Sequence, residues 1–204
     1  MAALDDLKVR IAYEIDRTDV DSAVADAVTS AIKFYKFKRF VFNETTDSFT
    51  TASGTSEYTT ALTAPNTLPD DILELDTARI TINSSDRYLL SPLTFEDIDD
   101  RDTSSTYTSR PVFYAWRAEN LRLYPTPNGS YVIDLRYLAD IDEETWATRA
   151  EAMIRCRAKK ELYAHVLWNA EKAMLMEQFE KQEFDALKRE YRIKNSSGRV
   201  VPHD

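Results

Sequence analysis

The longest periodic stretch of the sequence is residues 145–194, which read TWATRAEAMIRCRAKKELYAHVLWNAEKAMLMEQFEKQEFDALKREYRIK and contain neither proline nor glycine. Apolar side chains recur in it every three or four residues, which is the spacing of one face of an α-helix. The recurring positions are Trp146, Ala150, Ile154, Ala158, Leu162, Val166, Ala170 and Ala173, followed by Met176, Phe179, Phe184, Leu187 and Tyr191. One unbroken helix of this length would span roughly 75 Å, well beyond the width of a small domain. The stretch therefore predicts either a break near Asn169 or a distal half that projects from the body.

The distal half of this stretch is heavily charged and carries only a thin apolar stripe. Three pairs place an acidic residue four positions before a basic one: Glu177–Lys181, Asp185–Arg189 and Glu190–Lys194. Each such pair stabilises a helix by about 0.2–0.5 kcal/mol, which favours helix where burial is slight. A thin stripe on such a helix usually contacts a partner, so Phe184, Leu187 and Tyr191 are predicted interface residues.

Residues 195–204 are expected to form a C-terminal arm that follows the end of the helix. Within the arm, Arg199, Val200 and Val201 suit an extended segment that adds its backbone to the surface of a partner. Ordinary fraying of a chain terminus is the alternative. The arm and the thin helical stripe together form the predicted contact with a partner protein.

Two shorter helices are predicted at the N-terminal end of the chain. Residues 3–16 carry Leu4, Leu7, Ile11 and Ile15 at helical spacing. A second helix is expected to begin after Thr18 or Asp19, because either side chain is able to cap it. Its apolar stripe comprises Val20, Ala23, Val24, Ala27, Val28, Ala31, Ile32 and Tyr35. The small residues in this stripe suit close packing against another helix.

The middle of the chain, residues 41–144, has the pattern of a β-rich region. It begins with a segment rich in threonine, serine and aromatic residues, in which Gly54 marks a turn. The further predicted strands are residues 72–75, 78–82, 88–90, 112–116, 121–124 and 131–137. The strands at 112–116 and 121–124 are expected to pair, since only a short polar connection separates them. Several short strands of this kind predict a small antiparallel sheet or barrel.

Helices at both ends with strands between them predict an α+β fold in which a small antiparallel β module is inserted into a helical body. The helical body comprises residues 1–40, an N-terminal helix pair, and residues 145–194, a long C-terminal helix or helix pair. The inserted module comprises residues 41–144, and the arm comprises residues 195–204. The acidity is concentrated in the module, which holds nineteen acidic side chains against seven arginines.

Composition excludes several classes of protein. The chain has 204 residues, a net charge of −9 and only three glycines, which lie too far apart to share a loop. Phosphate-cradling loops, dinucleotide fingerprints and nucleophile elbows need clustered glycines, so none is expected. Cys156 is the sole cysteine, which excludes an intrachain disulfide. With neither a signal-peptide pattern nor a membrane-length apolar run, the default expectation is a cytoplasmic protein without membrane contact.

No catalytic, cofactor-binding or metal-binding residue is assigned from the sequence. One cysteine and two distant histidines do not make a zinc site or a supported nucleophile. The acidic run at residues 96–102 lacks the glycine and glutamate spacing of a calcium loop and is interpreted as a solvated face. The carboxylates available as a pair for glycoside hydrolysis are Glu119, Glu143 and Glu144, although no pattern in the sequence brings two of them together.

A run of alternating basic and aromatic residues, KFYKFKRF at 33–40, ends the second predicted helix. Basic side chains between aromatic ones can grip phosphate and stack on bases, as in proteins that bind single-stranded nucleic acid. A net charge of −9 opposes general binding of nucleic acid. Cations also complement the dipole at a helix C-terminus while neighbouring aromatics pack into a core. A structural role in the helix end and core is therefore the first interpretation of this run, and Lys36, Lys38 and Arg39 are the candidates for a secondary protein interface.

The order of several short segments carries a resemblance to a known family. The segments are IDRTD at 15–19, FVFNE at 40–44, LPDDILELD at 68–76, YLLSPLTFEDID at 88–99, RPVFYAW at 110–116 and LRLYPTP at 121–127. In this succession the chain resembles the head–tail adaptor (connector) proteins of tailed bacteriophages, over about residues 4–194. Proline-bounded strands are common one by one, so the resemblance rests on the ordered set.

The resemblance implies a structural protein of the virion neck, made in the host bacterial cytoplasm, rather than an enzyme. Members of the family form homo-oligomeric rings, typically dodecameric, that dock beneath the portal protein after genome packaging. The ring joins the capsid to tail or nozzle proteins, and genomic DNA passes through its channel. Some members in short-tailed phages are linked to cell-wall cleavage, so a virion-associated glycosidase that cleaves peptidoglycan is the alternative. The family supplies no active-site motif to transfer.

Overall fold

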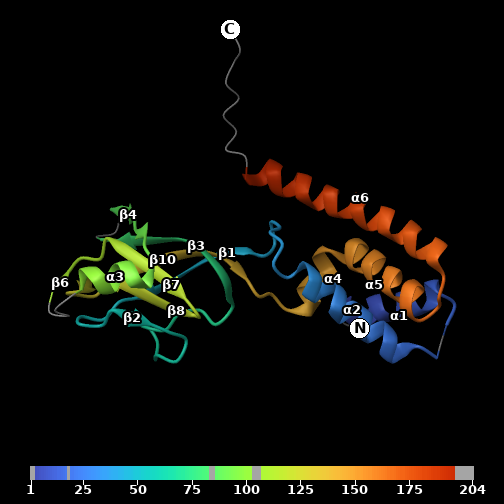
Figure 1. Cartoon of the computed structure of the whole chain (residues 1–204), viewed down its shortest axis with the longest axis horizontal. Helices are drawn as coiled ribbons and strands as arrows, with labels where there is room; N and C mark the ends of the chain where they lie inside the picture. Colours follow the sequence, from blue (N-terminus) through green and yellow to red (C-terminus); the bar gives the residue numbers. More distant parts are fainter. Residues whose placement is uncertain (1–2, 18, 83–85, 103–106, 196–204) are drawn as a thin grey trace, which may run out of the picture. The chain divides into compact units, whose positions relative to one another are not determined.

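The computed structural model describes residues 3–17, 19–82, 86–102 and 107–195, with side chains described up to residue 193 (Figure 1). Contacts divide the described chain into two compact units. The helical unit comprises the described residues of Met1–Asn43 and Ile141–Asp204, and the β unit comprises those of Glu44–Asp140. Apart from one short helix, the described helices lie in the helical unit and the described strands lie in the β unit, and the α+β prediction is confirmed.

Five helices build the helical unit. They are α1 (Ala3–Glu14), α2 (Asp21–Tyr35), α4 (Glu143–Arg149), α5 (Glu151–His165) and α6 (Ala170–Asn195). Helix α5 packs against both α2 and α6, and Figure 1 shows α6 running alongside α5. Leu7, Ile11, Val28, Ile154 and Leu162 lie in the shared core, each almost fully excluded from solvent. The apolar stripes predicted for the two ends of the chain therefore face one another in a single core.

The long C-terminal stretch breaks near Asn169, as one of the two alternatives predicted. Helix α5 ends at His165, and Trp168 reverses the chain with a left-handed backbone (φ 52°). The Asn169 side chain then accepts a hydrogen bond of 3.0 Å from the Lys172 amide and caps α6. A further break at Ala150 (φ −130°), between α4 and α5, was not predicted, because alanine is a good helix former and no cap or breaker marks the position.

The caps of the helices differ in part from expectation. Asp142 caps α4, accepting the Thr145 amide at 2.7 Å, and this backbone hydrogen bond lowers the pKa of its carboxyl. The predicted cap of α2 is wrong for Asp19, since the N-cap is Val20 and no side chain bonds to the first turn. Asp19 instead accepts hydrogen bonds of 2.6 Å from the Arg17 guanidinium. Thr18 lies outside the described residues.

The β unit contains a four-stranded antiparallel sheet ordered β1-β10-β3-β4. Its strands are β1 (Glu44–Thr50), β10 (Val132–Ala139), β3 (Ile72–Thr81) and β4 (Arg87–Leu89). Ile80, Ile133 and Leu135 are excluded from solvent, so one face of the sheet forms the core. The two strands predicted at 72–75 and 78–82 are a single strand, β3, because its pairing with β10 continues through a register shift.

A second four-stranded sheet has the order β2-β8-β7-β5 and is covered by a short helix, α3 (Phe95–Arg101), which contacts β7. Its strands are β2 (Glu57–Tyr58), β8 (Asn120–Tyr124), β7 (Phe113–Arg117) and β5 (Ser91–Pro92). The predicted pairing of 112–116 with 121–124 is confirmed as the antiparallel β7–β8 hairpin. Two very short strands, β6 (Thr108–Ser109) and β9 (Thr126–Pro127), form a small parallel pair.

The β7–β8 turn offers a test of backbone strain. Its two residues, Ala118 (φ 48°) and Glu119 (φ 61°), are both left-handed, the geometry of a type I′ turn that favours Asn-Gly. Glu119→Gly is therefore expected to raise the free energy of unfolding by about 0.5–1 kcal/mol, measured by urea denaturation. Glu119→Ala is the matched control, since it removes the same charge but keeps a Cβ. Equal stability of the two variants would contradict the explanation.

Candidate functional site

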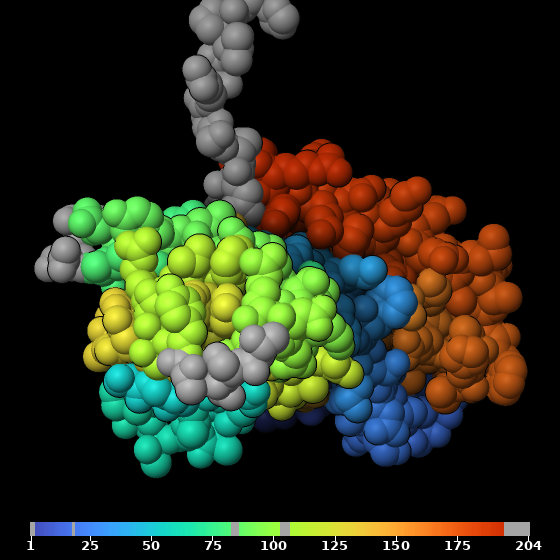
Figure 2. Space-filling view, turned by 60° about the vertical axis from the view of Figure 1, so that its left-hand side comes forward, coloured from blue at the N-terminus to red at the C-terminus, as the bar shows by residue number. Residues whose placement is uncertain are grey.

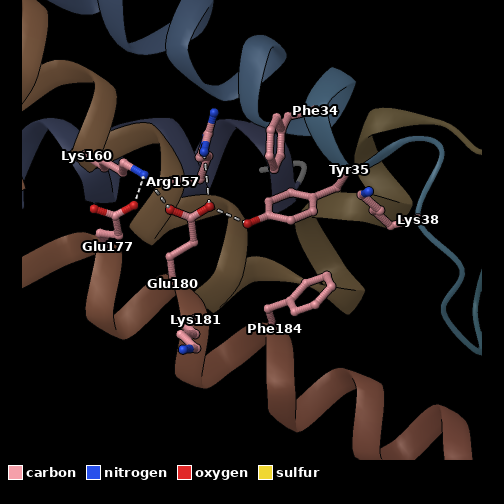
Figure 3. A pocket seen from close by; sticks show the side chains of 9 residues that line it. All are labelled: Phe34, Tyr35, Lys38, Arg157, Lys160, Glu177, Glu180, Lys181 and Phe184. Atoms are coloured by element: carbon pink, nitrogen blue, oxygen red, sulfur yellow. Dashed lines mark hydrogen bonds and ion pairs between the residues drawn. The ribbon is translucent and has the colours of Figure 1, made fainter. Parts of the chain in front are cut away.

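A groove on the helical unit is lined by both charged and aromatic side chains. We call it the α2–α6 groove; it has a volume of about 350 Å³ and lies where α2, α5 and α6 meet (Figure 3). Its lining comprises Phe34, Tyr35, Lys38, Arg157, Lys160, Glu177, Glu180, Lys181 and Phe184. The residues come from α2 and the turn that follows it, and from α5 and α6 much later in the sequence, so the groove exists only in the folded unit.

Glu180 organises the base of the groove and is only 7% exposed. Its Oε1 accepts hydrogen bonds from the Tyr35 hydroxyl at 2.5 Å and from Arg157 Nη1 at 3.2 Å. Its Oε2 lies 3.5 Å from Lys160 Nζ, which also bonds to Glu177 at 2.9 Å. A buried carboxylate needs such partners, because burial of an unpaired charge is strongly unfavourable. The network thereby fixes α6 against both α2 and α5.

The Tyr35 hydroxyl acts as a neutral donor in this network. Its burial raises the pKa of the hydroxyl, and the hydrogen bond to the Glu180 carboxylate raises it further. The ring of Tyr35 lies between Phe34 and Phe184 (Figure 3), edge-on to the first at 5.0 Å and stacked on the second at 5.9 Å between centroids. The Arg157 guanidinium lies 3.8 Å from the centroid of Phe34. The groove therefore has an aromatic floor beside a paired set of charges.

Lys38 and Lys181 complete the lining and have a different character. Both side chains are exposed, and within the described residues no hydrogen bond or ion pair engages either ammonium group. The other two cations of the lining, Arg157 and Lys160, are paired with glutamates. Since the lining contains four cations and two carboxylates, it carries a net charge of +2. An apolar floor with unpaired cations suits an acidic partner that also offers apolar atoms.

A second surface feature lies at the turn between α5 and α6. Trp168 is 82% exposed there, although its left-handed backbone is one that glycine would adopt at less cost. Met174 (65% exposed) and Leu175 (45% exposed) follow on α6 and line a shallow cavity of about 410 Å³. Exposed tryptophan and methionine are enriched where proteins bind one another, so this turn is a further candidate contact surface.

The residues predicted for the portal interface lie along α6. Phe184 and Leu187 are half-buried and pack against the core of the helical unit. Tyr191 is half-buried, and Lys188 Nζ lies 5.4 Å from the centroid of its ring. The three predicted positions in the arm, Arg199, Val200 and Val201, lie outside the described residues.

The structure separates the members of the secondary interface predicted from the basic run. Lys38 lies in the lining of the groove, together with Phe184. Lys36 and Arg39 are half-buried and outside the lining; the backbone carbonyl of Arg39 accepts a hydrogen bond of 2.8 Å from Lys188. Sequence patterns thus identified two of the nine lining residues as contact candidates.

The sequence patterns did not predict most of the charged network in the groove. Glu177 was predicted to pair with Lys181 one turn later, but it bonds to Lys160 of α5 instead. Arg157 and Glu180 carry no local signal, because they meet only when α6 folds back on α5. A clue was available in Glu180, which falls one residue after Phe179 on the predicted stripe and so near the packed face of the helix.

The carboxylates considered for glycoside hydrolysis have structural contacts. Glu144 accepts hydrogen bonds from the backbone amides of Ala3 and, at 3.0 Å, of Leu4, which places an anion at the N-terminus of α1. Glu143 accepts a hydrogen bond of 3.3 Å from Thr29. Glu119 is exposed at the β7–β8 turn in the other unit. Burial raises the pKa of the Cys156 thiol, which keeps it protonated and unreactive.

Among the residues that the structure describes, no three or more His, Cys, Asp or Glu side chains are grouped so that they could hold a metal ion. Over the same residues, no helix has the length and apolar character needed to span a membrane.

Comparison with protein families adds one finding to this geometry. A family model described as SU10 adaptor protein matches residues 2–202, which is nearly the whole chain. Among curated proteins, no match was found.

Proposed function

Because this chain belongs to the SU10 adaptor protein family, we propose that it forms an oligomeric ring beneath the portal of a tailed bacteriophage. As a member of that family it is a structural component of the phage virion that contacts other phage structural proteins. In the proposed ring it joins the capsid to tail or nozzle proteins and continues the DNA channel. The protein would be made in the host cytoplasm and act in the neck of the virion.

The observation that carries the proposal is the extent of the family match. It covers both the helical unit and the β unit, so the entire architecture is that of an adaptor and not a shared module joined to something else. An adaptor acts through surfaces rather than through an active site. The helical unit offers such surfaces in the α2–α6 groove and in the exposed Trp168 turn.

The distribution of charge also supports a ring through which DNA passes. The β unit, Glu44–Asp140, holds sixteen acidic residues and seven arginines, a net charge of −9, whereas the rest of the chain holds nineteen of each sign. Nucleic acid is bound chiefly by neutralising its phosphates, so an acidic surface does not retain DNA that must slide past it. A ring also repeats one heterologous contact, which requires two different surfaces on each chain.

We further propose that the C-terminal helix and arm attach the protein to the portal. The shortened chain that ends at residue 194 is then expected to bind purified portal at least about tenfold more weakly than the full chain, in a co-sedimentation titration. Its far-UV circular dichroism and thermal unfolding should match those of the full chain, since the core of the helical unit is untouched. Equal portal binding by the two chains would contradict attachment through the arm.

A further inference from the structure

The α2–α6 groove has features that favour the binding of an acidic partner. Its floor is formed by the rings of Phe34, Tyr35 and Phe184, and Phe34 is 49% exposed. Lys38 and Lys181, also in the lining, are exposed cations that no described residue engages. Unpaired lysines beside exposed aromatic surface give a site that favours anions by Coulomb attraction and apolar atoms by burial.

A complementary acidic surface is present on the β unit of the same chain. Helix α3 carries four exposed carboxylates in seven residues, which are Glu96, Asp97, Asp99 and Asp100. The helix lies at the surface in the space-filling view (Figure 2). Glu96 bonds to Arg117 at 3.1 Å, which places α3 beside the β7–β8 turn that bears Glu119. We call α3 together with this turn the α3 face.

Not every carboxylate of the α3 face is free to pair with another molecule. Glu96 and Asp99 form ion pairs with Arg117 and Arg122, and Asp97 completes the capping box of α3. Asp100 and Glu119 are exposed and have no such partner among the described residues. The half-buried ring of Phe113, over which the C-terminal Arg101 of α3 lies, supplies apolar surface. The face thus offers two unpaired anions and apolar atoms, which complement the unpaired lysines and the aromatic floor of the groove.

We propose that the α2–α6 groove of one copy of this chain receives the α3 face of the next copy. The groove and the face are different surfaces on different units, so the contact is heterologous and repeats from copy to copy, as closure of a ring requires. The inference rests on the proposed ring and specifies the interface that builds it. Alternative occupants of the groove are an acidic segment of the portal and DNA phosphate, and the test below separates them from a second copy.

The test reverses the charges on each side of the contact in turn, in the full chain. The groove variant is Lys38→Glu with Lys181→Glu, and the face variant is Asp100→Lys with Glu119→Lys. The control is Lys8→Glu with Lys33→Glu, which changes the net charge by the same amount as the groove variant at two positions outside the groove and outside the C-terminal helix. Each protein is mixed with purified portal, and the number of chains per portal is measured by native mass spectrometry and electron microscopy.

For each reversal variant alone, the fraction of portals that carry a complete ring is expected to be at least about tenfold lower than for the unaltered chain. The reason is that like charges then meet at every contact. An equimolar mixture of the two variants should restore complete rings, since each groove then meets a face of opposite sign. The control should form rings as the unaltered chain does. Raised salt should weaken ring closure in the unaltered chain, as expected for exposed charge pairs.

Three results would overturn the proposal. Full ring formation by the groove variant alone would show that the groove is not the contact. A defect that the mixture does not repair would assign the groove to the portal or to DNA instead of a second copy. Failure of the unaltered chain to bind portal at all would refute the proposed function itself, and is thereby distinguished from failure of the interface.

Discussion

Trp146→Ala is expected to lower the free energy of unfolding of the helical unit by about 3–5 kcal/mol, the largest loss predicted for a single substitution in this protein. The indole is 1% exposed, and the rings of Phe40 and Phe42 meet it edge-on at 5.8 and 5.1 Å. Removing it leaves a cavity between α4 and the segment that follows α2, because neighbouring groups relax only partly. Urea denaturation followed by circular dichroism at the helical band measures the loss.

Trp168→Ala is the matched control for this prediction. It makes the same chemical change at a tryptophan that is 82% exposed, so the free energy of unfolding should change by less than about 0.5 kcal/mol. Similar losses for the two substitutions would contradict the assignment of Trp146 to the core. A portal-binding or ring-closure defect in Trp168→Ala without loss of stability would identify the α5–α6 turn as a contact surface.

Glu180→Ala is expected to cost about 2–4 kcal/mol of unfolding free energy. The substitution leaves the Tyr35 hydroxyl without its acceptor, and it removes the carboxylate that Arg157 and Lys160 share. Both effects loosen α6 from α2 and α5. Thermal and urea unfolding, followed at the helical circular dichroism band, provide the measurement.

Two comparison variants make the Glu180 prediction specific. Glu180→Gln keeps an oxygen that accepts from Tyr35, so its loss should be smaller than that of Glu180→Ala. Glu177→Ala removes a carboxylate that pairs with Lys160 but whose side chain is 62% exposed, and it should cost less than about 1 kcal/mol. If Glu177→Ala and Glu180→Ala were equally destabilising, the central role given to Glu180 would be wrong.

Much of the fold could be predicted because its signals are local. Helical spacing located α1, α2 and the long C-terminal stretch, and a break near Asn169 was one of the two alternatives predicted for that stretch. In the structure the Asn169 side chain caps α6. The β7–β8 hairpin was recognisable from two apolar runs with a short connection. The break at Ala150 and the left-handed Trp168 were not predictable, because tertiary packing overrides the ordinary preferences of these residues.

Little of the groove could be predicted from the sequence, because most of its contacts join residues that are far apart along the chain. Phe184 and Lys38 stood out through apolar and basic patterns along their own segments. The bond between Glu177 and Lys160 joins residues seventeen positions apart, and that between Tyr35 and Glu180 joins residues 145 positions apart. Local spacing favoured Lys181 as the partner of Glu177, but the fold-back of α6 onto α5 brought a better-placed lysine into reach.

The most direct test of the central claim is electron microscopy of the purified full-length chain mixed with the portal protein of the same phage. A connector is expected to appear as a closed ring of many copies seated on one face of the portal, with the channel open through both. A chain that leaves the portal particles bare at a large molar excess, or that binds them only as scattered single copies, would contradict a head–tail connector.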